Sequence, residues 1–312
     1  MTGNHRFIPL RVRALALAAL YTVAANAQAA NADVYRETYP RVAIDPAQGV
    51  AGAGAADFGA TLQYWQDEKS LEQNSQWIGD LEHEWKLNWK FLDLDRSDDM
   101  HPGYLALDKG EKLFKFWAKR EPSFRTCLGE GKTDLKGLAA NYPKYDPKLK
   151  KIMTVESRVE HCAQTALWEN FKQGSPANNQ ISLYFKSLSA YTPIKVDTGS
   201  AEIMAAYQRG EKLFYAKVGQ YNFACASCHT STGLLGQRFR GQVPTSPFGD
   251  AAHFPTYRTG LGDIESLQQR FMRCNLQART KALPPGDPAY TDLEVFYTVL
   301  SNDYPVSVPS AR

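Results

Sequence analysis

The spacing of apolar residues along the chain predicts a mainly helical protein. Near the C-terminus, four apolar residues recur at the i, i+3, i+4, i+7 spacing of one buried helix face, namely Leu293, Phe296, Tyr297 and Leu300. A second amphipathic helix is expected over residues 263–279, with Asp263 as its N-cap. Three residues are expected on the buried face of that helix, namely Leu267, Phe271 and Cys274.

Three sequence segments occur twice in the same order, which predicts two tandem copies of one domain. They are the pentapeptide Gly-Glu-Lys-Leu-Phe at 110–114 and 210–214, the pair Arg158 and Cys162 matched by Arg270 and Cys274, and Leu188-Ser189 matched by Leu300-Ser301. The first match has an offset of 100 residues and the other two an offset of 112. Each copy is expected to contain a helix before a cysteine-containing loop, a middle helix that ends near a second cysteine, and a final amphipathic helix.

Residues 1–29 have the three parts of a secretory signal peptide. Arginines precede a short apolar stretch at residues 14–25, and small residues then fit an Ala-x-Ala cleavage site at either 25–27 or 27–29. The apolar stretch is shorter than the ~20 residues that a membrane-spanning helix needs. We therefore expect export to the periplasm, cleavage of the signal peptide, and a mature chain without a membrane span.

Residues 30–100 are expected to hold a tether followed by helices that pack on a neighbouring domain. Residues 49–59 are rich in Gly and Ala, a composition typical of a flexible tether. Between residues 62 and 94, tryptophans occur at roughly helical spacing, and core packing is a commoner role for them than ligand binding. The repeat then defines a first domain over residues 101–195 and a second over residues 196–312.

Composition and charge narrow the class of function. The chain is 43% hydrophobic and 22% charged, a balance typical of globular proteins. Its net charge of +3 is small, and its basic residues are scattered, so nucleic-acid binding is not expected. Five cysteines in an exported chain leave at least one outside any disulfide within the chain.

The sequence Cys225-Ala-Ser-Cys228-His229 predicts one covalently attached haem c. One helical turn places the two sulfurs beside the two vinyl groups of the haem, and the adjacent His229 then ligates the iron. A redox dithiol or half of a zinc site would also contain Cys-x-x-Cys. The adjacent histidine, the signal peptide and the lack of a second such cysteine pair favour haem.

The first copy has lost this motif. When the copies are aligned on Cys127, Glu130 and Gly131 replace the second cysteine and the histidine. We therefore expect a mainly α fold with two tandem cytochrome c-like domains, the first without haem, preceded by a helical N-terminal segment. Cys127 and Cys162 would flank the former haem pocket, and in an oxidising compartment we expect a disulfide between them. Two separate buried thiols are the alternative.

Cys274 is the favoured ligand on the opposite side of the iron from His229. Met272 is a competing ligand, because His and Met form the usual pair in cytochromes c. Residues two positions apart on a helix are separated by about 200° of rotation, so Met272 and Cys274 cannot both face the iron. Cys274 has a cysteine counterpart in the first copy, Cys162, which favours it over Met272. His253, on a proline-flanked loop, is a third candidate.

From residue 60 onward the sequence resembles the SoxA subunits of the SoxAX cytochromes of bacterial thiosulfate oxidation. The resemblance rests on the two copies, on Cys225-x-x-Cys228-His229, and on the Arg-Phe-Met-Arg-Cys-Asn segment at 270–275. Some members of that family carry a haem in both copies. This sequence resembles the single-haem form, in which a disulfide replaces the lost haem.

The resemblance implies an L-cysteine S-thiosulfotransferase, which joins thiosulfate oxidatively to a cysteine of the SoxYZ carrier protein. Electrons would leave through the haem to a small partner cytochrome, SoxX, in a heterodimer. In the family the ligand cysteine is also the catalytic residue, found as a persulfide, and a nearby arginine binds substrate. These roles fall on Cys274 and Arg270, which lie four residues apart on one helix face. Arg273 lies about 100° away around the helix and is the weaker choice.

Two other classes of function remain open on the sequence alone. A plain periplasmic electron carrier with His/Met ligation would leave Cys274 as an inert thiol. A docking subunit whose haem does not turn over would use the N-terminal segment and the first copy as its partner surface. A dihaem peroxidase is not favoured, because the chain has one haem motif.

Overall fold

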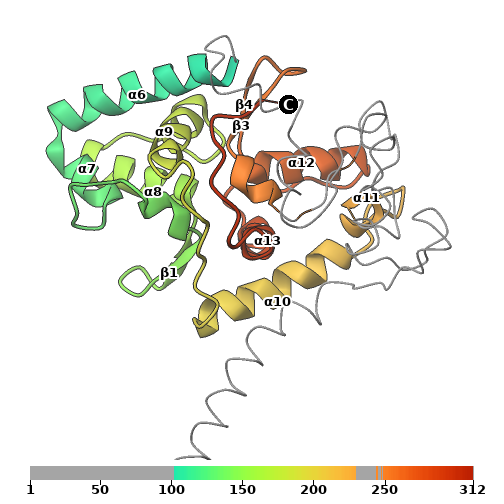
Figure 1. Cartoon of the computed structure of the whole chain (residues 1–312). Coiled ribbons are helices and arrows are strands. Elements are labelled where there is room, and N and C mark those ends of the chain that lie inside the picture. The colour runs from blue at the N-terminus through green and yellow to red at the C-terminus, as the bar shows by residue number, and fades with distance from the viewer. Residues whose placement is uncertain (1–101, 230–243, 245–246, 248, 312) are drawn as a thin grey trace, which may run out of the picture. The chain divides into compact units, whose positions relative to one another are not determined.

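The computed structural model describes residues 102–229, 244, 247 and 249–311 (Figure 1). The predicted signal peptide at 1–29 and the predicted tether and packing helices at 30–100 lie outside the described residues. Within the described ranges, no helix is both long enough and apolar enough to cross a membrane. Most of the regular structure there is helical, which confirms the predicted fold class at that level.

The described chain begins with a helical segment interrupted by one hairpin. Its elements are α6 (Pro102–Arg120), α7 (Pro122–Leu128), a 3-10 turn η1 (Leu138–Asn141), strands β1 (Lys144–Asp146) and β2 (Lys151–Met153), α8 (Val155–Cys162), a π turn η2 (Ala163–Leu167) and α9 (Pro176–Ser187).

A similar order of elements follows. It comprises α10 (Ala201–Tyr215), α11 (Ala226–His229), a 3-10 turn η3 (Asp250–His253), strands β3 (Thr256–Arg258) and β4 (Asp263–Glu265), α12 (Leu267–Gln277) and α13 (Pro288–Val299). Both hairpins are antiparallel, and their registers match at the offset of 112 residues: Asp146 pairs with Lys151 and Arg258 with Asp263. The sequence repeat therefore corresponds to a repeat of secondary structure.

The middle helix of each half starts in the same way. Thr154 caps α8 and Ser266 caps α12, each through a capping box with the residue three positions later, Ser157 or Gln269. The prediction that Asp263 caps the helix is therefore wrong. Residues 263–265 pair with β3 instead, and that pairing uses the backbone groups that a longer helix would have needed.

The first and last helices of each half pack against each other. Phe114 on α6 contacts Tyr184 on α9, and Phe214 on α10 contacts Phe296 on α13, with ring centroids 5.0 Å apart in both pairs. The four residues predicted on the buried face near the C-terminus are all at most 5% exposed, namely Leu293, Phe296, Tyr297 and Leu300. Both phenylalanines of the repeated pentapeptide are thus core residues.

Polar contacts join the two halves. The Asn179 side-chain amide donates to the Ile264 carbonyl at 3.0 Å, and Lys186 Nζ donates to the Ala251 carbonyl at 2.8 Å. The segment at 191–194, after α9, also forms backbone hydrogen bonds with residues 303–306 near the C-terminus. This pairing fixes the second half against the segment that connects the halves.

Candidate haem and thiolate site

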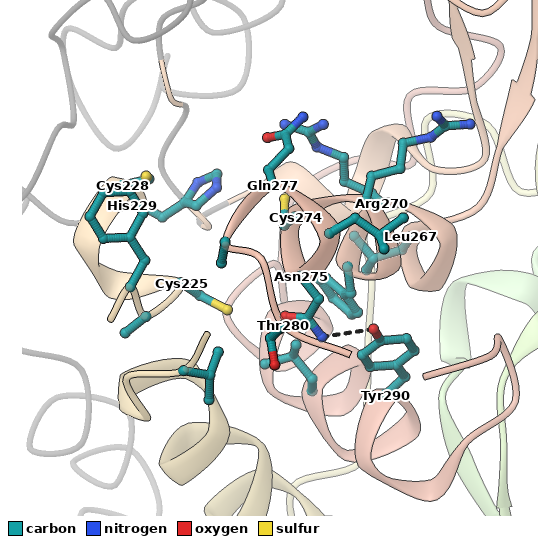
Figure 2. A pocket seen from close by; sticks show the side chains of 18 of the residues that line it. Cys225, Cys228, His229, Leu267, Arg270, Cys274, Asn275, Gln277, Thr280 and Tyr290 are labelled. Atoms are coloured by element: carbon teal, nitrogen blue, oxygen red, sulfur yellow. Dashed lines mark hydrogen bonds between the residues drawn. The ribbon is translucent and has the colours of Figure 1, made fainter. Parts of the chain in front are cut away.

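The predicted haem motif forms a single helical turn. The backbone N–H groups of Cys228 and His229 both donate to the Cys225 carbonyl, at 3.1 and 3.0 Å. The Ala224 N–H donates to the Ser227 hydroxyl at 3.0 Å, which fixes the start of the turn. The two cysteines and the histidine of this turn thereby line one cavity, as Figure 2 shows.

The cavity has a volume of about 1310 Å³, above the ~300–1,000 Å³ that is usual for small-ligand sites. It is lined by apolar side chains from several elements, among them Leu213, Phe254, Leu267, Phe271, Leu293 and Tyr297. Cys225, Cys228 and Cys274 are all free thiols on its walls. A large apolar space beside two thiols and an imidazole fits covalent haem c, with His229 as the residue that would ligate the iron.

Helix α12 supplies the second group of chemically active side chains. Cys274 and Arg270 both line the cavity from this helix, away from the α11 turn that carries the haem motif (Figure 2). The C-terminal part of α12 is anchored beside Cys274, because Asn275 donates to the Tyr290 hydroxyl of α13 at 2.8 Å. The structure brings Arg270 and Cys274, both candidates from the sequence, to one cavity.

The two competing iron ligands lie elsewhere. Among the described residues that line the cavity, neither Met272 nor His253 is found. His253 was expected on a loop, but it is fully buried at the end of η3, where the Ser310 hydroxyl donates to its carbonyl. Of the three candidate ligands, Cys274 is the one found among the described residues that line the cavity.

The charge on Arg270 is coupled to Cys274. The negative charge of a Cys274 thiolate raises the pKa of Arg270 above its usual value, because it stabilises the guanidinium cation. Arg273, one residue before Cys274, instead forms an ion pair with Glu265, which is 1% exposed. Both arginines line the cavity, but Arg273 has a carboxylate partner in Glu265.

Arg258 was missed in the sequence. It ends β3, is 8% exposed, and lines the same cavity as Arg270 and Cys274. Its Nε lies 3.4 Å from Oε2 of Glu265. No motif in the sequence marks Arg258, and the repeat relates it only to Asp146, which occupies the same register position in the first half.

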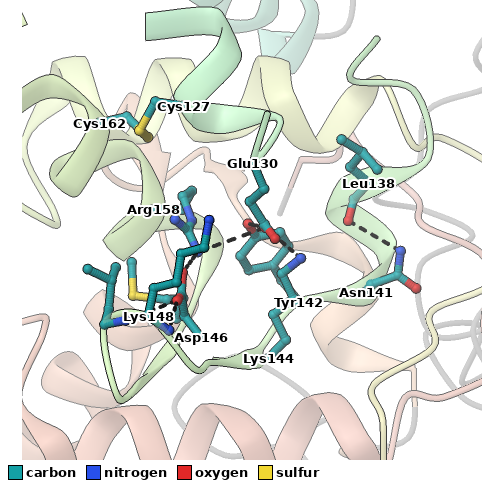
Figure 3. A network of polar contacts seen from close by, with 12 residues as sticks. Cys127, Glu130, Leu138, Asn141, Tyr142, Lys144, Asp146, Lys148, Arg158 and Cys162 are labelled. Carbon is teal, nitrogen blue, oxygen red and sulfur yellow. Dashed lines mark hydrogen bonds and ion pairs between the residues drawn. A yellow bond between two sulfur atoms is a disulfide. The ribbon is translucent and has the colours of Figure 1, made fainter. Parts of the chain in front are cut away.

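In the first half, a polar network lies beside a disulfide (Figure 3). The predicted bond between Cys127 and Cys162 is present, with a Cα–Cα distance of 5.6 Å. Glu130, which replaces the second motif cysteine, accepts a hydrogen bond from the Tyr142 hydroxyl. Arg158 Nη2 lies 2.5 Å from Oδ2 of Asp146.

Comparisons with known proteins show what the chain is similar to. Residues 109–194 match the family model described as the SoxA/TsdA cytochrome c domain. The chain is 29% identical to the L-cysteine S-thiosulfotransferase subunit SoxA of Allochromatium vinosum over 228 residues, 72% of this chain and 77% of that protein. It is also 29% identical to the SoxA subunit of Chlorobaculum thiosulfatiphilum over 244 residues, 78% of this chain and 81% of that protein.

The fold has a solved counterpart. The crystal structure of SoxXA from P. pantotrophus matches with a TM-score of 0.59 and 23% identity, covering 68% of this chain and 78% of that chain. This likeness supports the fold. The sequence matches separately show that the chain is similar to SoxA subunits over most of its length.

Proposed function

We propose that this relative of the SoxA subunits is a periplasmic L-cysteine S-thiosulfotransferase. It would join thiosulfate oxidatively to a cysteine of a SoxYZ-like carrier protein. One haem c would be attached through Cys225 and Cys228, with His229 and Cys274 as iron ligands. The electrons released would pass through that haem to a SoxX-like small cytochrome bound as a heterodimer.

One observation carries this proposal. Arg270 and Cys274 lie one turn apart on α12 and line the cavity that the haem motif also lines. A thiolate beside a cation is nucleophilic and oxidisable, and a guanidinium fork suits the oxygens of an oxyanion. An inert buried thiol, as the electron-carrier alternative requires, would not need a cationic neighbour in the cavity.

The chemistry can be written with these two side chains. Arg270 holds the sulfonate end of thiosulfate, so that its terminal sulfur faces Cys274. An S–S bond forms between the Cys274 thiolate and that sulfur as two electrons leave. The carrier thiolate then attacks the transferred sulfur, and the Cys274 thiolate is the leaving group. A bound haem would supply the electron path, one electron at a time.

We propose further that residues 101–195 form a haemless cytochrome c-like domain and residues 196–312 a haem-binding one. The first half has neither a second motif cysteine nor a motif histidine, and a disulfide joins Cys127 to Cys162 there. Export with cleavage of residues 1–29 follows from the signal-like sequence and is consistent with a disulfide.

Cys274→Ser tests this function. The variant should keep covalent haem, because Cys225, Cys228 and His229 are unchanged, and it should lose the conjugation of thiosulfate to the carrier cysteine. Mass spectrometry of the carrier after incubation with thiosulfate and an electron acceptor reports the adduct directly. Conjugation at the normal rate in Cys274→Ser would contradict the proposal and support the alternative, a plain electron carrier.

A further inference from the structure

The two halves place different residues at one pair of equivalent positions. Asp146 ends β1 and Arg258 ends β3, in hairpins of the same register. Arg158 and Arg270 are each the fourth residue after the N-cap of the following helix. The equivalent pairs are therefore Asp146 with Arg158 in the first half and Arg258 with Arg270 in the second.

In the first half this pair is neutral overall. Arg158 Nη2 lies 2.5 Å from Asp146 Oδ2, and the two side chains are only 5% and 12% exposed. Burial alone would raise the pKa of Asp146, but the hydrogen bond from Arg158 and two backbone N–H groups hold it below its usual range. Arg158 Nη2 also lies 3.8 Å from Glu130, and although Arg158 Nε is buried without an acceptor, the positive charge is compensated within the chain.

In the second half both positions carry a positive charge. Burial, and then the charge of Arg270, lower the pKa of Arg258 below its usual value. Like charges at a buried site are unfavourable unless an anion compensates them. Two buried carboxylates, Glu265 and Asp250, compensate these charges in part, and Glu265 also pairs with Arg273.

One nitrogen of the Arg258 guanidinium has no hydrogen-bond partner among the described residues. Within the part of the chain that the structure describes, Nη1 of Arg258 is buried and has no hydrogen-bond acceptor. Arg258 lines the cavity together with Arg270 and Cys274. Leaving a charged donor buried and unsatisfied is costly, so the arrangement fits an oxyanion that enters the cavity.

We propose that Arg258 is a second substrate-binding residue, which with Arg270 holds the oxygens of a sulfur oxyanion beside Cys274. Two guanidinium groups match the double negative charge of thiosulfate, whereas one would leave half of it uncompensated. This inference rests on the proposed function for the identity of the substrate. A haem propionate is the other oxyanion that such a donor can bind, and the experiment separates the two.

The test measures thiosulfate binding to the oxidised haem-loaded protein by calorimetry, without a carrier, so that no turnover occurs. Arg258→Gln should weaken binding by roughly tenfold or more, the usual loss for a hydrogen bond to a charged group. Arg258→Asp should weaken it further, because it rebuilds the neutral pair of the first half. Arg209→Gln is the matched control: it removes an exposed arginine that pairs with Asp292 on α10 and α13, and binding should be unchanged.

Arg258→Lys is the variant to measure if Arg258→Gln does not fold. Lysine keeps the charge beside Glu265 but has no second nitrogen, so thiosulfate binding should still weaken. Unchanged binding in the folded Arg258 variants overturns the proposal. If binding is unchanged and the haem reduction potential shifts instead, Arg258 binds a propionate and the proposal also fails. Cys274→Ser should retain thiosulfate binding, so a failure of the proposed function is seen separately.

Discussion

A Cβ atom added to Gly210 would lie 2.1 Å from the carbonyl oxygen of Asp292. Gly110 has the same relationship to the carbonyl oxygen of Gln180, also at 2.1 Å. These glycines open the repeated pentapeptide, and they allow the backbone of the first helix in each half to touch that of the last helix. The repetition of Gly-Glu-Lys-Leu-Phe is thereby explained, because its glycine sits at the crossing and its phenylalanine packs beside it.

Gly210→Ala should destabilise the second half. The added methyl group meets backbone atoms that cannot move aside, so the helices α10 and α13 must separate, at a cost of at least about 2 kcal/mol. Urea unfolding would measure the loss, and covalent haem content would fall if the cavity opens. Gly260→Ala is the control, because a Cβ there meets nothing within 4 Å. Equal stability of the two variants would contradict the close crossing.

The Cys127–Cys162 disulfide should contribute about 3–4 kcal/mol to stability. It closes a loop with a sequence separation of 35, and the loss of chain entropy in the unfolded state grows with loop length. The double variant Cys127→Ala, Cys162→Ala should therefore unfold at lower urea concentration while it keeps its haem. Peptide mapping without reductant provides the check on the wild type. Recovery of both cysteines as free thiols would contradict the bond.

Cys274→Met should convert the haem to the His/Met type. A neutral thioether stabilises ferric iron less than a thiolate does, so the reduction potential should rise by on the order of 0.1 V, within the ~0.8 V range that axial ligands set. EPR and absorption spectra would show the change of ligand. Met272→Leu should leave both spectra unaltered, because Met272 is not among the described residues that line the cavity. The reverse pattern would identify Met272 as the ligand.

Local patterns predicted the parts of the site that depend on short spacings. The turn at 225–229 and the shared face of Arg270 and Cys274 follow from helix geometry alone. The start of α12 was not predicted correctly, because residues 263–265 pair as a strand with a segment that lies five or more residues earlier in the chain. Arg258 was missed for the same reason: only packing of the hairpin against α12 brings it to the cavity.

The buried charges between the halves were also beyond the reach of sequence patterns, since they meet through tertiary packing. Glu156 on α8, Lys186 on α9 and Glu294 on α13 line one small space, and both carboxyl groups are at most 8% exposed. Gln268 on α12 donates to Glu294 at 2.8 Å. Burial, and then the nearby charge of Glu156, raise the pKa of Glu294 to about 8.

This shift predicts a stability that falls as pH rises. The pKa of Glu294 in the folded state lies above its unfolded value of 4.5, so its protonated form favours folding at pH 4.5 and below, and this contribution is lost as pH rises to about 8. Glu294→Gln keeps the size and the neutral charge of the protonated form. It should therefore match the wild type near pH 5 and melt about 2–4 °C higher at pH 8.5.

Exposed Glu169→Gln is the matched control and should melt with the wild type at both pH values. Scanning calorimetry at the two pH values makes the comparison direct. Lys186 faces the same space, and burial lowers its pKa, so it compensates an ionised Glu294 only in part. If Glu294→Gln instead lowers the melting temperature at pH 8.5, then the ionised carboxylate is stabilising there and Lys186 is its effective partner.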